Sequence, residues 1–257
     1  MIKDQRKNLL NIVETTDSYF KGDLVNAGKK IAISQSNYIP WKGYFDIINT
    51  VDEFILYDDV QFTKRDWRNR NLIKTKNGLE WLTISVEAKG RFPQKIREAR
   101  ISSKVWNLKH WKTIVHNYSR AKYFDEYRSY FEKLYMSIDS EFLSDVNHTF
   151  IKAVCDILDI KTRLVRSSDY ILADGKTDRL VSMCKQEKAS EYYTGPRAKD
   201  YIEEEKFKDA EIKLIYFDYS NYPEYEQLWG GFEHKVTILD LIFNEGPNVA
   251  KYMKSFK

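Results

Sequence analysis

The stretch from Ile31 to Asn71 constrains the fold most, because it combines two buried strands and a helix in a short length of chain. Lys30–Ser34 is a short apolar run that suits a strand buried on both faces. Apolar residues then recur at helical spacing over residues 43–50, and Phe54–Tyr57 is a second apolar run. Strand, helix and strand in this order predict a βαβ unit with a right-handed crossover and two parallel strands.

Two loops follow the predicted strands, at residues 35–41 and 58–71, and they carry many polar and aromatic side chains. Ligands of open parallel sheets bind beyond the carboxyl ends of the strands, so we expect both loops to face one crevice. The candidate ligand-binding residues in and around these loops are Gln35, Asn37, Tyr38, Trp41, Lys42, Gly43, Tyr44, Gln61, Lys64, Arg65, Trp67, Arg68, Asn69 and Arg70.

The basic residues among these candidates favour an anionic ligand. Arginine makes bidentate contacts with phosphate or carboxylate groups, so the cluster over residues 64–70 suits a pyrophosphate or a nucleotide-linked sugar. Gly43 lies at the start of the predicted helix, where a ligand could approach the backbone closely and an anion would meet free N–H groups. The alternative is that the charges only solvate a surface loop.

The acidic pair Asp58-Asp59 has three interpretations. It holds a divalent cation, it removes a proton from an amine or hydroxyl, or it caps the following turn. Asp59 is the preferred base, and His110 and His234 are further candidates for general base. The four histidines show no metal-binding motif such as HExxH, so we predict no metal site from them.

The rest of the chain predicts one α/β domain over residues 29–257, with a helical insertion around residues 104–158 and an N-terminal extension, 1–28. A hairpin is expected over residues 71–86, a short edge strand over 96–101, and further strands over 162–165, 190–194 and 212–216. A short helix from about residue 9 to near Gly22 is expected, with further helices over 176–186, 198–201 and 236–243. The motifs GPRAKDY and FEHKVTILDLIFNEG are expected to close the crevice from its other side, which adds Gly195, Lys199, Asp240 and Asn244 as candidates.

Charge and cysteine content narrow the class of protein. The 42 basic and 38 acidic residues give a formal net charge of +4, mixed along the chain, which argues against a nucleic-acid-binding protein. Two distant cysteines predict a reduced, cytoplasmic protein, and the N-terminus has no signal-peptide core. No apolar run is long enough for a membrane span. The sequence leaves homo-oligomer formation open.

Five segments together resemble the WbqC-like protein family from about residue 30 to the C-terminus. They are IAISQSNYIPWKGYFDII, DEFILYDDVQFTKRDWRNRNLIKT, GKTDRLVSMCK, EYYTGPRAKDYI and QLWGGFEHKVTILDLIFNEG. Arg197 stands where a small residue is expected in the fourth segment. The resemblance implies a role in O-antigen or related polysaccharide biosynthesis. It also implies a transferase that attaches an aminoacyl or acyl group, such as glycine, to the amino group of a nucleotide-linked sugar.

The helix that opens with Gly43-Tyr44 is also similar to nucleotidylyltransferase-like folds, where Gly-His opens the corresponding helix. That likeness implies a Rossmann-like, mostly parallel sheet. The second strand leading to DDVQF is loosely similar to pantothenate synthetases, which activate a carboxylate with ATP and pass it to an amine, and this implies an ATP-dependent amide ligase using ATP and Mg²⁺. Tyr44 in place of histidine leaves a second donor open, an already activated acyl thioester or aminoacyl-tRNA. A non-catalytic protein that binds a nucleotide-linked sugar, or assembles with a glycosyltransferase, is the alternative from another class.

Overall fold

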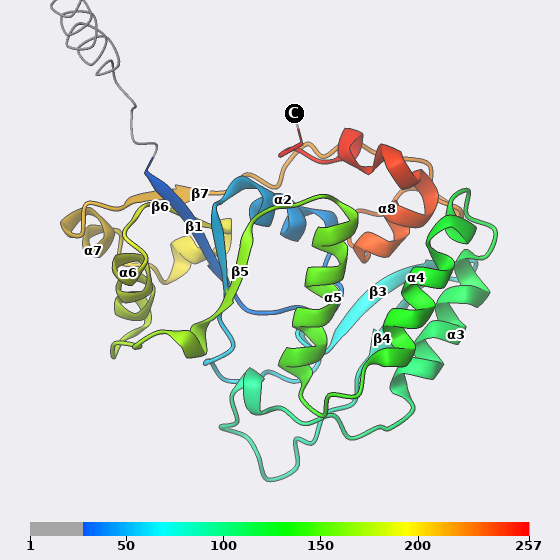
Figure 1. Ribbon diagram of the computed structural model, residues 1–257, viewed down its shortest axis with the longest axis horizontal. Helices are drawn as coiled ribbons and strands as arrows, with labels where there is room; N and C mark the ends of the chain where they lie inside the picture. The colour runs from blue at the N-terminus through cyan, green and yellow to red at the C-terminus, as the bar shows by residue number, and fades with distance from the viewer. Residues whose placement is uncertain (1–27, 257) are drawn as a thin grey trace, which may run out of the picture.

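A five-stranded, all-parallel sheet forms the centre of the computed structural model, which describes residues 28–256 (Figure 1). The strand order is β5-β2-β1-β6-β7. The strands are β1 (Lys29–Ser34), β2 (Glu53–Leu56), β5 (Arg163–Arg166), β6 (Ala189–Thr194) and β7 (Lys213–Tyr216). The predicted α/β fold with a parallel sheet is therefore confirmed. Apart from Gly28, the predicted extension 1–28, with its helix ending near Gly22, lies outside the described residues.

Side chains of the central strands alternate between two hydrophobic cores, as the period of a strand requires. Ile31 and Ile33 of β1 join one core, while Ala32 joins the other. The first core also contains residues of α6 (Lys176–Gln186) and α7 (Glu204–Asp209). The second contains residues of helices on the opposite face, namely α2 (Lys42–Thr50), α5 (Leu143–Ile157) and α8 (Ile238–Glu245). The described part of the chain thus has three layers, with the sheet between two sets of helices (Figure 1).

The predicted helical insertion is also confirmed. The hairpin β3 (Arg70–Thr75) and β4 (Gly78–Thr83) forms a separate two-stranded sheet, and α3 (Trp106–Tyr118) and α4 (Phe124–Ser137) lead into α5. The predicted edge strand over 96–101 is wrong, because a short 3-10 helix, η1 (Ile96–Glu98), begins it. The Glu98 carboxylate accepts a hydrogen bond from the Lys95 N–H at 2.9 Å, and this local bond favours a turn over strand pairing.

The C-terminal half contains both predicted and missed elements. After β6 the chain forms the 3-10 helix η3 (Pro196–Asp200), which overlaps the short helix predicted over 198–201, and then α7, a short helix that was missed. The predicted helix over 236–243 is α8, displaced by two residues because the Thr237 hydroxyl caps it by accepting from the Leu239 N–H. A further 3-10 helix, η4 (Gly246–Tyr252), follows.

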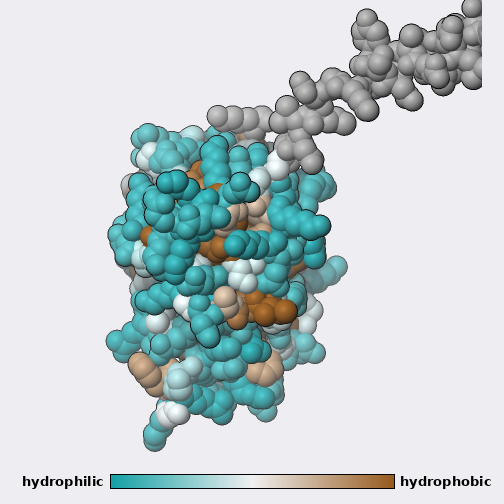
Figure 2. Space-filling view, turned by 90° about the vertical axis from the view of Figure 1, so that its left-hand side faces the viewer, coloured by the Kyte–Doolittle hydropathy of each residue, from teal (hydrophilic) through white to brown (hydrophobic). Residues whose placement is uncertain are grey.

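The surface on the side of α6 and α7 is mostly hydrophilic, with apolar side chains in small separate patches (Figure 2). Within residues 28–256, no helix has the length and apolar character needed to cross a membrane.

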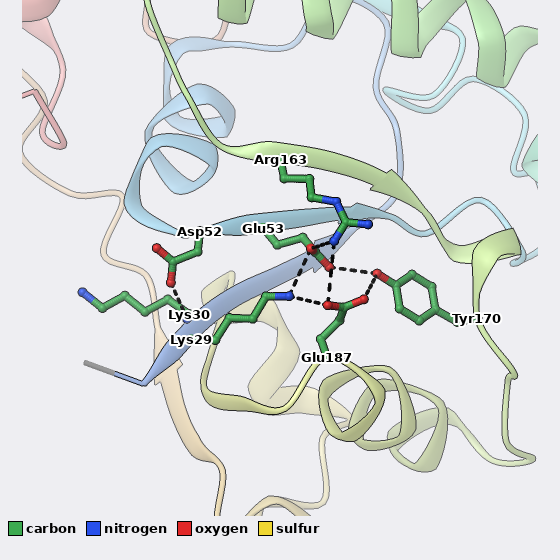
Figure 3. Close-up of polar contacts among 7 residues, drawn as sticks. All are labelled: Lys29, Lys30, Asp52, Glu53, Arg163, Tyr170 and Glu187. Carbon is green, nitrogen blue, oxygen red and sulfur yellow. Dashed lines mark hydrogen bonds and ion pairs between the residues drawn. The ribbon is translucent and has the colours of Figure 1, made fainter. Parts of the chain in front are cut away.

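Charged side chains join the amino-terminal ends of the strands (Figure 3). Glu53 of β2 is 1% exposed and accepts from Lys29 of β1 at 3.1 Å and from Arg163 of β5 at 2.7 Å. The hydroxyl of Tyr170 lies 2.8 Å from a carboxylate oxygen of both Glu53 and Glu187. This network, which we call the Glu53 cluster, holds three strands together at the edge opposite their carboxyl ends.

Candidate functional site

A cavity of about 1320 Å³ lies at the carboxyl ends of β1, β2 and β6. Gln35 follows β1, Asp59 follows β2, and Gly195 follows β6, and all three line the cavity. In chain order the parallel strands are arranged 3-2-1-4-5, so the connections leaving β1 and β6 run to opposite faces of the sheet. A crevice opens at such a switch point, which is where doubly wound sheets bind ligands.

The cavity brings together residues from both loops that were predicted to share a crevice. Its lining also includes parts of the two later motifs. The predicted site residues that line it are Gln35, Asn37, Trp41, Tyr44, Asp59, Gln61, Trp67, Gly195 and His234. Tyr44 is fixed there, because its hydroxyl donates to the Gln35 carbonyl at 2.9 Å. Burial raises the pKa of Tyr44 well above its usual value, so the phenol stays protonated.

Tyr38 and His110 belong to the core and do not line the cavity. Tyr38 is fully buried, and its hydroxyl lies 2.9 Å from His110 Nδ1 and 2.9 Å from the Tyr135 hydroxyl. Burial lowers the pKa of His110 to about 4, so the imidazole is neutral at physiological pH. Because an aromatic cluster encloses both side chains, the predicted ligand contact of Tyr38 and base role of His110 have no support in this geometry.

The two carboxylates of the acidic pair do not share one site. Asp58 is 4% exposed and accepts hydrogen bonds from the Ser36 N–H at 2.9 Å and from the Ser144 hydroxyl. It therefore anchors the first loop to α5, which corresponds to the structural interpretation. Asp59 lines the cavity and accepts from Lys95 at 3.0 Å and Arg97 at 2.7 Å.

Asp59 is a poor candidate for a base. Burial opposes ionisation of its carboxyl, but hydrogen bonds from Lys95 and Ser167 and the charge of Arg97 outweigh burial and lower the pKa below its usual value. A metal held by this carboxylate would have to displace two cations. Within the described part of the chain, no three His, Cys, Asp or Glu side chains gather as metal ligands. The residues present do not fit a protein-held Mg²⁺.

The predicted basic patch is dispersed by the fold. Arg68 does not line the cavity, and it donates to the Asn37 side-chain oxygen and pairs with Asp66 at 3.8 Å. The guanidinium of Arg70 stacks over Trp81, with 3.9 Å between its carbon and the ring centroid. Lys64 and Arg65 are exposed and outside the cavity lining. None of the four arrives at the cavity as the phosphate contact that was predicted.

The start of α2 is covered by a side chain. A Cβ on Gly43 would lie 2.4 Å from Cζ2 of Trp41, so the indole occupies the space that a ligand was expected to use. Lys42 points into a cage of aromatic rings formed by Tyr222, Tyr225 and Phe232, at 5.0 to 5.8 Å from their centroids. It also donates to the Pro223 carbonyl at 2.8 Å, and burial lowers its pKa to about 8.

The remaining predicted residues hold the frame around the cavity. Asp240 is 1% exposed and accepts from Tyr118 and Tyr225 at 2.8 Å and from Gln227 at 2.9 Å. The hydrogen-bond partners of Asp240 are thus protein groups in the core. Asn69 and Asn244 also bond to the protein itself, because their amides donate to backbone carbonyls at 2.8 Å. Lys199 lies over the Tyr216 ring at 4.8 Å, outside the lining.

Sequence reasoning missed two groups of lining residues. One is cationic and consists of Lys95, Lys176, Arg179, Arg197 and Lys235. The other is aromatic and consists of Tyr57, Tyr192, Tyr201, Tyr219 and Tyr222. The strand topology could have indicated these residues, because the segments that follow β5 and β6 also lie at the carboxyl edge of the sheet.

His234 is the titratable cavity residue best suited to accept a proton. Burial and the positive charge of Lys42 lower its pKa below the usual value, against the opposing charges of Glu224 and Glu233. The imidazole is therefore neutral at physiological pH. Its Nδ1 atom is buried without a hydrogen-bond partner within residues 28–256.

Comparisons with known proteins place the chain in a family without assigning an activity. The model of the WbqC-like protein family matches residues 35–252. A protein of Mycobacterium tuberculosis, "Uncharacterized protein Rv1507c", is 51% identical over 226 residues, which cover 88% of this chain and 98% of the relative. No solved structure matches the chain. The long family match agrees with the resemblance carried by the five sequence segments, and the chain belongs to the WbqC-like protein family.

Proposed function

We propose that this protein is a transferase for O-antigen or other surface-glycan biosynthesis. It would attach an acyl or aminoacyl group, glycyl being one, to the amino group of a nucleotide-linked sugar. The reaction would take place in the cytoplasm, on the precursor side of the membrane. Family membership motivates the substrate class, and the cavity carries the structural part of the argument.

The observation that favours this function most is the size and composition of the cavity. Pockets for one small ligand usually measure about 300–1000 Å³. At about 1320 Å³ this cavity exceeds that range, which suits a nucleotide-linked sugar and an acyl donor bound together. Aromatic side chains such as Trp41, Trp67 and Tyr219 offer faces for a base or a sugar ring, and the cations suit phosphates.

Direct transfer between two bound substrates fits the side chains better than a covalent enzyme intermediate on sulfur. Neither of the two cysteines lines the cavity, and burial raises the pKa of each thiol to about 12. In the proposed step the sugar amine attacks the donor carbonyl. A C–N bond forms, the bond to the leaving group breaks, and the amine proton passes to the neutral imidazole of His234.

The donor is an activated carboxylate made from ATP and an amino acid, an acyl thioester or an aminoacyl-tRNA. One experiment separates these routes from each other and from a non-catalytic role. A uridine-diphosphate-linked amino sugar is incubated with the protein and ATP plus glycine, with the protein and acetyl-coenzyme A, or with the protein and glycyl-tRNA, and the mass of the sugar is measured by mass spectrometry. A mass gain in one mixture supports the transferase and names the donor class. Binding of the sugar with no mass gain in any mixture would overturn the proposal in favour of a binding or assembly protein.

A further inference from the structure

The lining of the cavity carries an excess of positive charge. Its charged lining residues are one carboxylate, Asp59, and five cations, Lys95, Lys176, Arg179, Arg197 and Lys235. Lys95 is neutralised by its ion pair with Asp59. Across residues 28–256, no Asp or Glu side chain forms an ion pair with the other four. A solvent-filled cavity with such a lining attracts anions.

Three of these four cations come from neighbouring elements on one side of the sheet. Lys176 and Arg179 lie in the opening turn of α6, and Arg197 lies in η3, directly after β6. Helices α6 and α7 pack on the same core, on the face of the sheet opposite α2 and α8. Lys235, in contrast, precedes α8 and belongs to the other side. The three residues Lys176, Arg179 and Arg197 are called the α6 wall below.

The opening turn of a helix is an unfavourable place for two cations. The amino-terminal end of a helix carries partial positive charge, and like charges three residues apart repel each other, each at a cost of a few tenths of a kcal/mol up to about 1 kcal/mol. Asp178 in the same turn complements the helix end, but its carboxylate is paired with Lys206 at 2.7 Å. An anion bound against the α6 wall would offset the repulsion between Lys176 and Arg179.

Arg179 is already held in place for such a contact. Its Nε donates to the Ala173 carbonyl at 3.0 Å, and its two terminal nitrogens have no partner within the described residues. A fixed guanidinium with two free N–H₂ groups matches the spacing of two phosphate oxygens. The hydroxyl-bearing rings of Tyr57, Tyr192 and Tyr201 line the same cavity and offer contacts to an attached sugar or base.

We propose that Lys176, Arg179 and Arg197 form a polyphosphate subsite that holds the diphosphate of a nucleoside-diphosphate-linked sugar. The identity of the attached groups rests on the proposed function, whereas diphosphate binding does not. Arg197 stands in the motif GPRAKDY at the position where a small residue is expected. This subsite therefore has one more cation than a chain with the expected small residue would have. The arginines over residues 65–70 have no part in it.

The test measures the affinity of the whole protein for inorganic pyrophosphate and for uridine diphosphate by isothermal titration calorimetry, at low and at moderate salt. The variants are Arg179→Gln, Arg197→Gln and the double variant, and Lys64→Gln is the matched control from the exposed loop. Each single variant is expected to weaken both ligands about tenfold, the double variant more, and the control less than twofold. Added salt is expected to weaken binding to the wild type and to have less effect on the double variant.

Arg197→Gln keeps the test valid if Arg179→Gln disturbs the loop at Ala173, because Arg197 is exposed to solvent. Equal affinities of the wild type and the double variant, or undetectable pyrophosphate and uridine diphosphate binding by the wild type at millimolar concentration, would overturn the subsite. Tight diphosphate binding without acyl transfer would leave the subsite standing and remove the proposed function. Normal acyl transfer by the double variant would remove the subsite and leave the proposed function standing.

Discussion

The indole of Trp41 lies so close to Gly43 that an added Cβ would come within 2.4 Å of the ring atom Cζ2. This contact joins the last residue of the loop to the start of α2, and it sets where the indole lies in the cavity wall. It also explains why a glycine is needed inside a helix whose backbone there is ordinary. The glycine serves a protein side chain and leaves no room for a ligand at this helix end.

Gly43→Ala is therefore expected to destabilise the protein although alanine favours a helix. Overpacking costs about 1–3 kcal/mol, while replacing glycine by alanine in a helix returns about 1 kcal/mol at most. We expect a net loss in the free energy of unfolding of about 1–2 kcal/mol in urea denaturation. Gly231→Ala is the control, because no atom lies within 4 Å of its added Cβ. Equal losses in the two variants would show that the Trp41 contact is not tight.

The Glu53 cluster predicts a stability change without a change at the cavity. Glu53→Gln removes the charge that two cations share at the amino-terminal edge of the sheet. Because Arg163 is 65% exposed and can be solvated, we expect a loss of about 2 kcal/mol, below the ~3–5 kcal/mol typical of a broken buried pair. Glu141→Gln, which breaks a surface pair with Arg100, should cost under about 1 kcal/mol. Affinity for pyrophosphate should be the same as in the wild type.

The parallel sheet and its crevice could be predicted from local patterns, because strand burial and the strand–helix–strand order are written in consecutive residues. The apolar runs near Ile33 and Ile55 have the period and length of buried strands. Connectivity alone then put Gln35 and Asp59 at one edge. Neither step needed contacts between distant parts of the chain.

Which side chains line the site depends on such distant contacts. For this reason the local sequence pattern predicted the wrong cations. Arg68 and Arg70 look like a phosphate patch in sequence, but burial against Asn37 and stacking on Trp81 give them structural partners. Arg179 and Arg197 lie more than a hundred residues further along the chain and reach the cavity only because β6 inserts beside β1. The hydrophobic periodicity of a strand does not indicate which other strand pairs with β1.

Asp59 predicts a loss of stability in acid. Its pKa is lowered in the folded state, so the stabilisation is present at neutral pH and is lost as the pH falls below about 4, the usual value for aspartate. Asp59→Asn should lower the free energy of unfolding at pH 7 by about 1–3 kcal/mol. The gap between variant and wild type should narrow between pH 4 and pH 3 in urea denaturation. Asp139→Asn, an exposed control, should show no gap at either pH.

The lowered pKa of Lys42 predicts that stability rises with pH in the alkaline range. Because burial lowers its pKa from 10.5 to about 8, the charged amine costs stability below pH 8, and this cost is relieved as the pH rises toward 9.5. The wild type should gain stability over that range relative to Lys42→Met, which fills the aromatic cage without a charge. Lys112→Met, on an exposed residue of α3, should follow the wild type. Parallel curves for Lys42→Met and the wild type would contradict a shifted amine.

His234 provides the most direct test of the proposed transfer. His234→Gln should lower kcat about 10²–10⁴-fold, the usual contribution of a general base, with at most a small change in affinity for the nucleotide-linked sugar. His116→Gln, an exposed histidine of α3, is the matched control and should keep the wild-type rate.

The pH profile separates a base from a merely structural histidine. Because burial and the charge of Lys42 lower the pKa of His234, the rate should fall only at pH values below the usual 6.5 of histidine. Removing that charge in Lys42→Met should raise the pKa of His234 and move the acid limb of the profile upward. Glu224 and Glu233, whose charges oppose that of Lys42, should produce the reverse shift when each is changed to glutamine. An acid limb that stays in place in all three variants, with an unchanged kcat in His234→Gln, would remove His234 from the reaction.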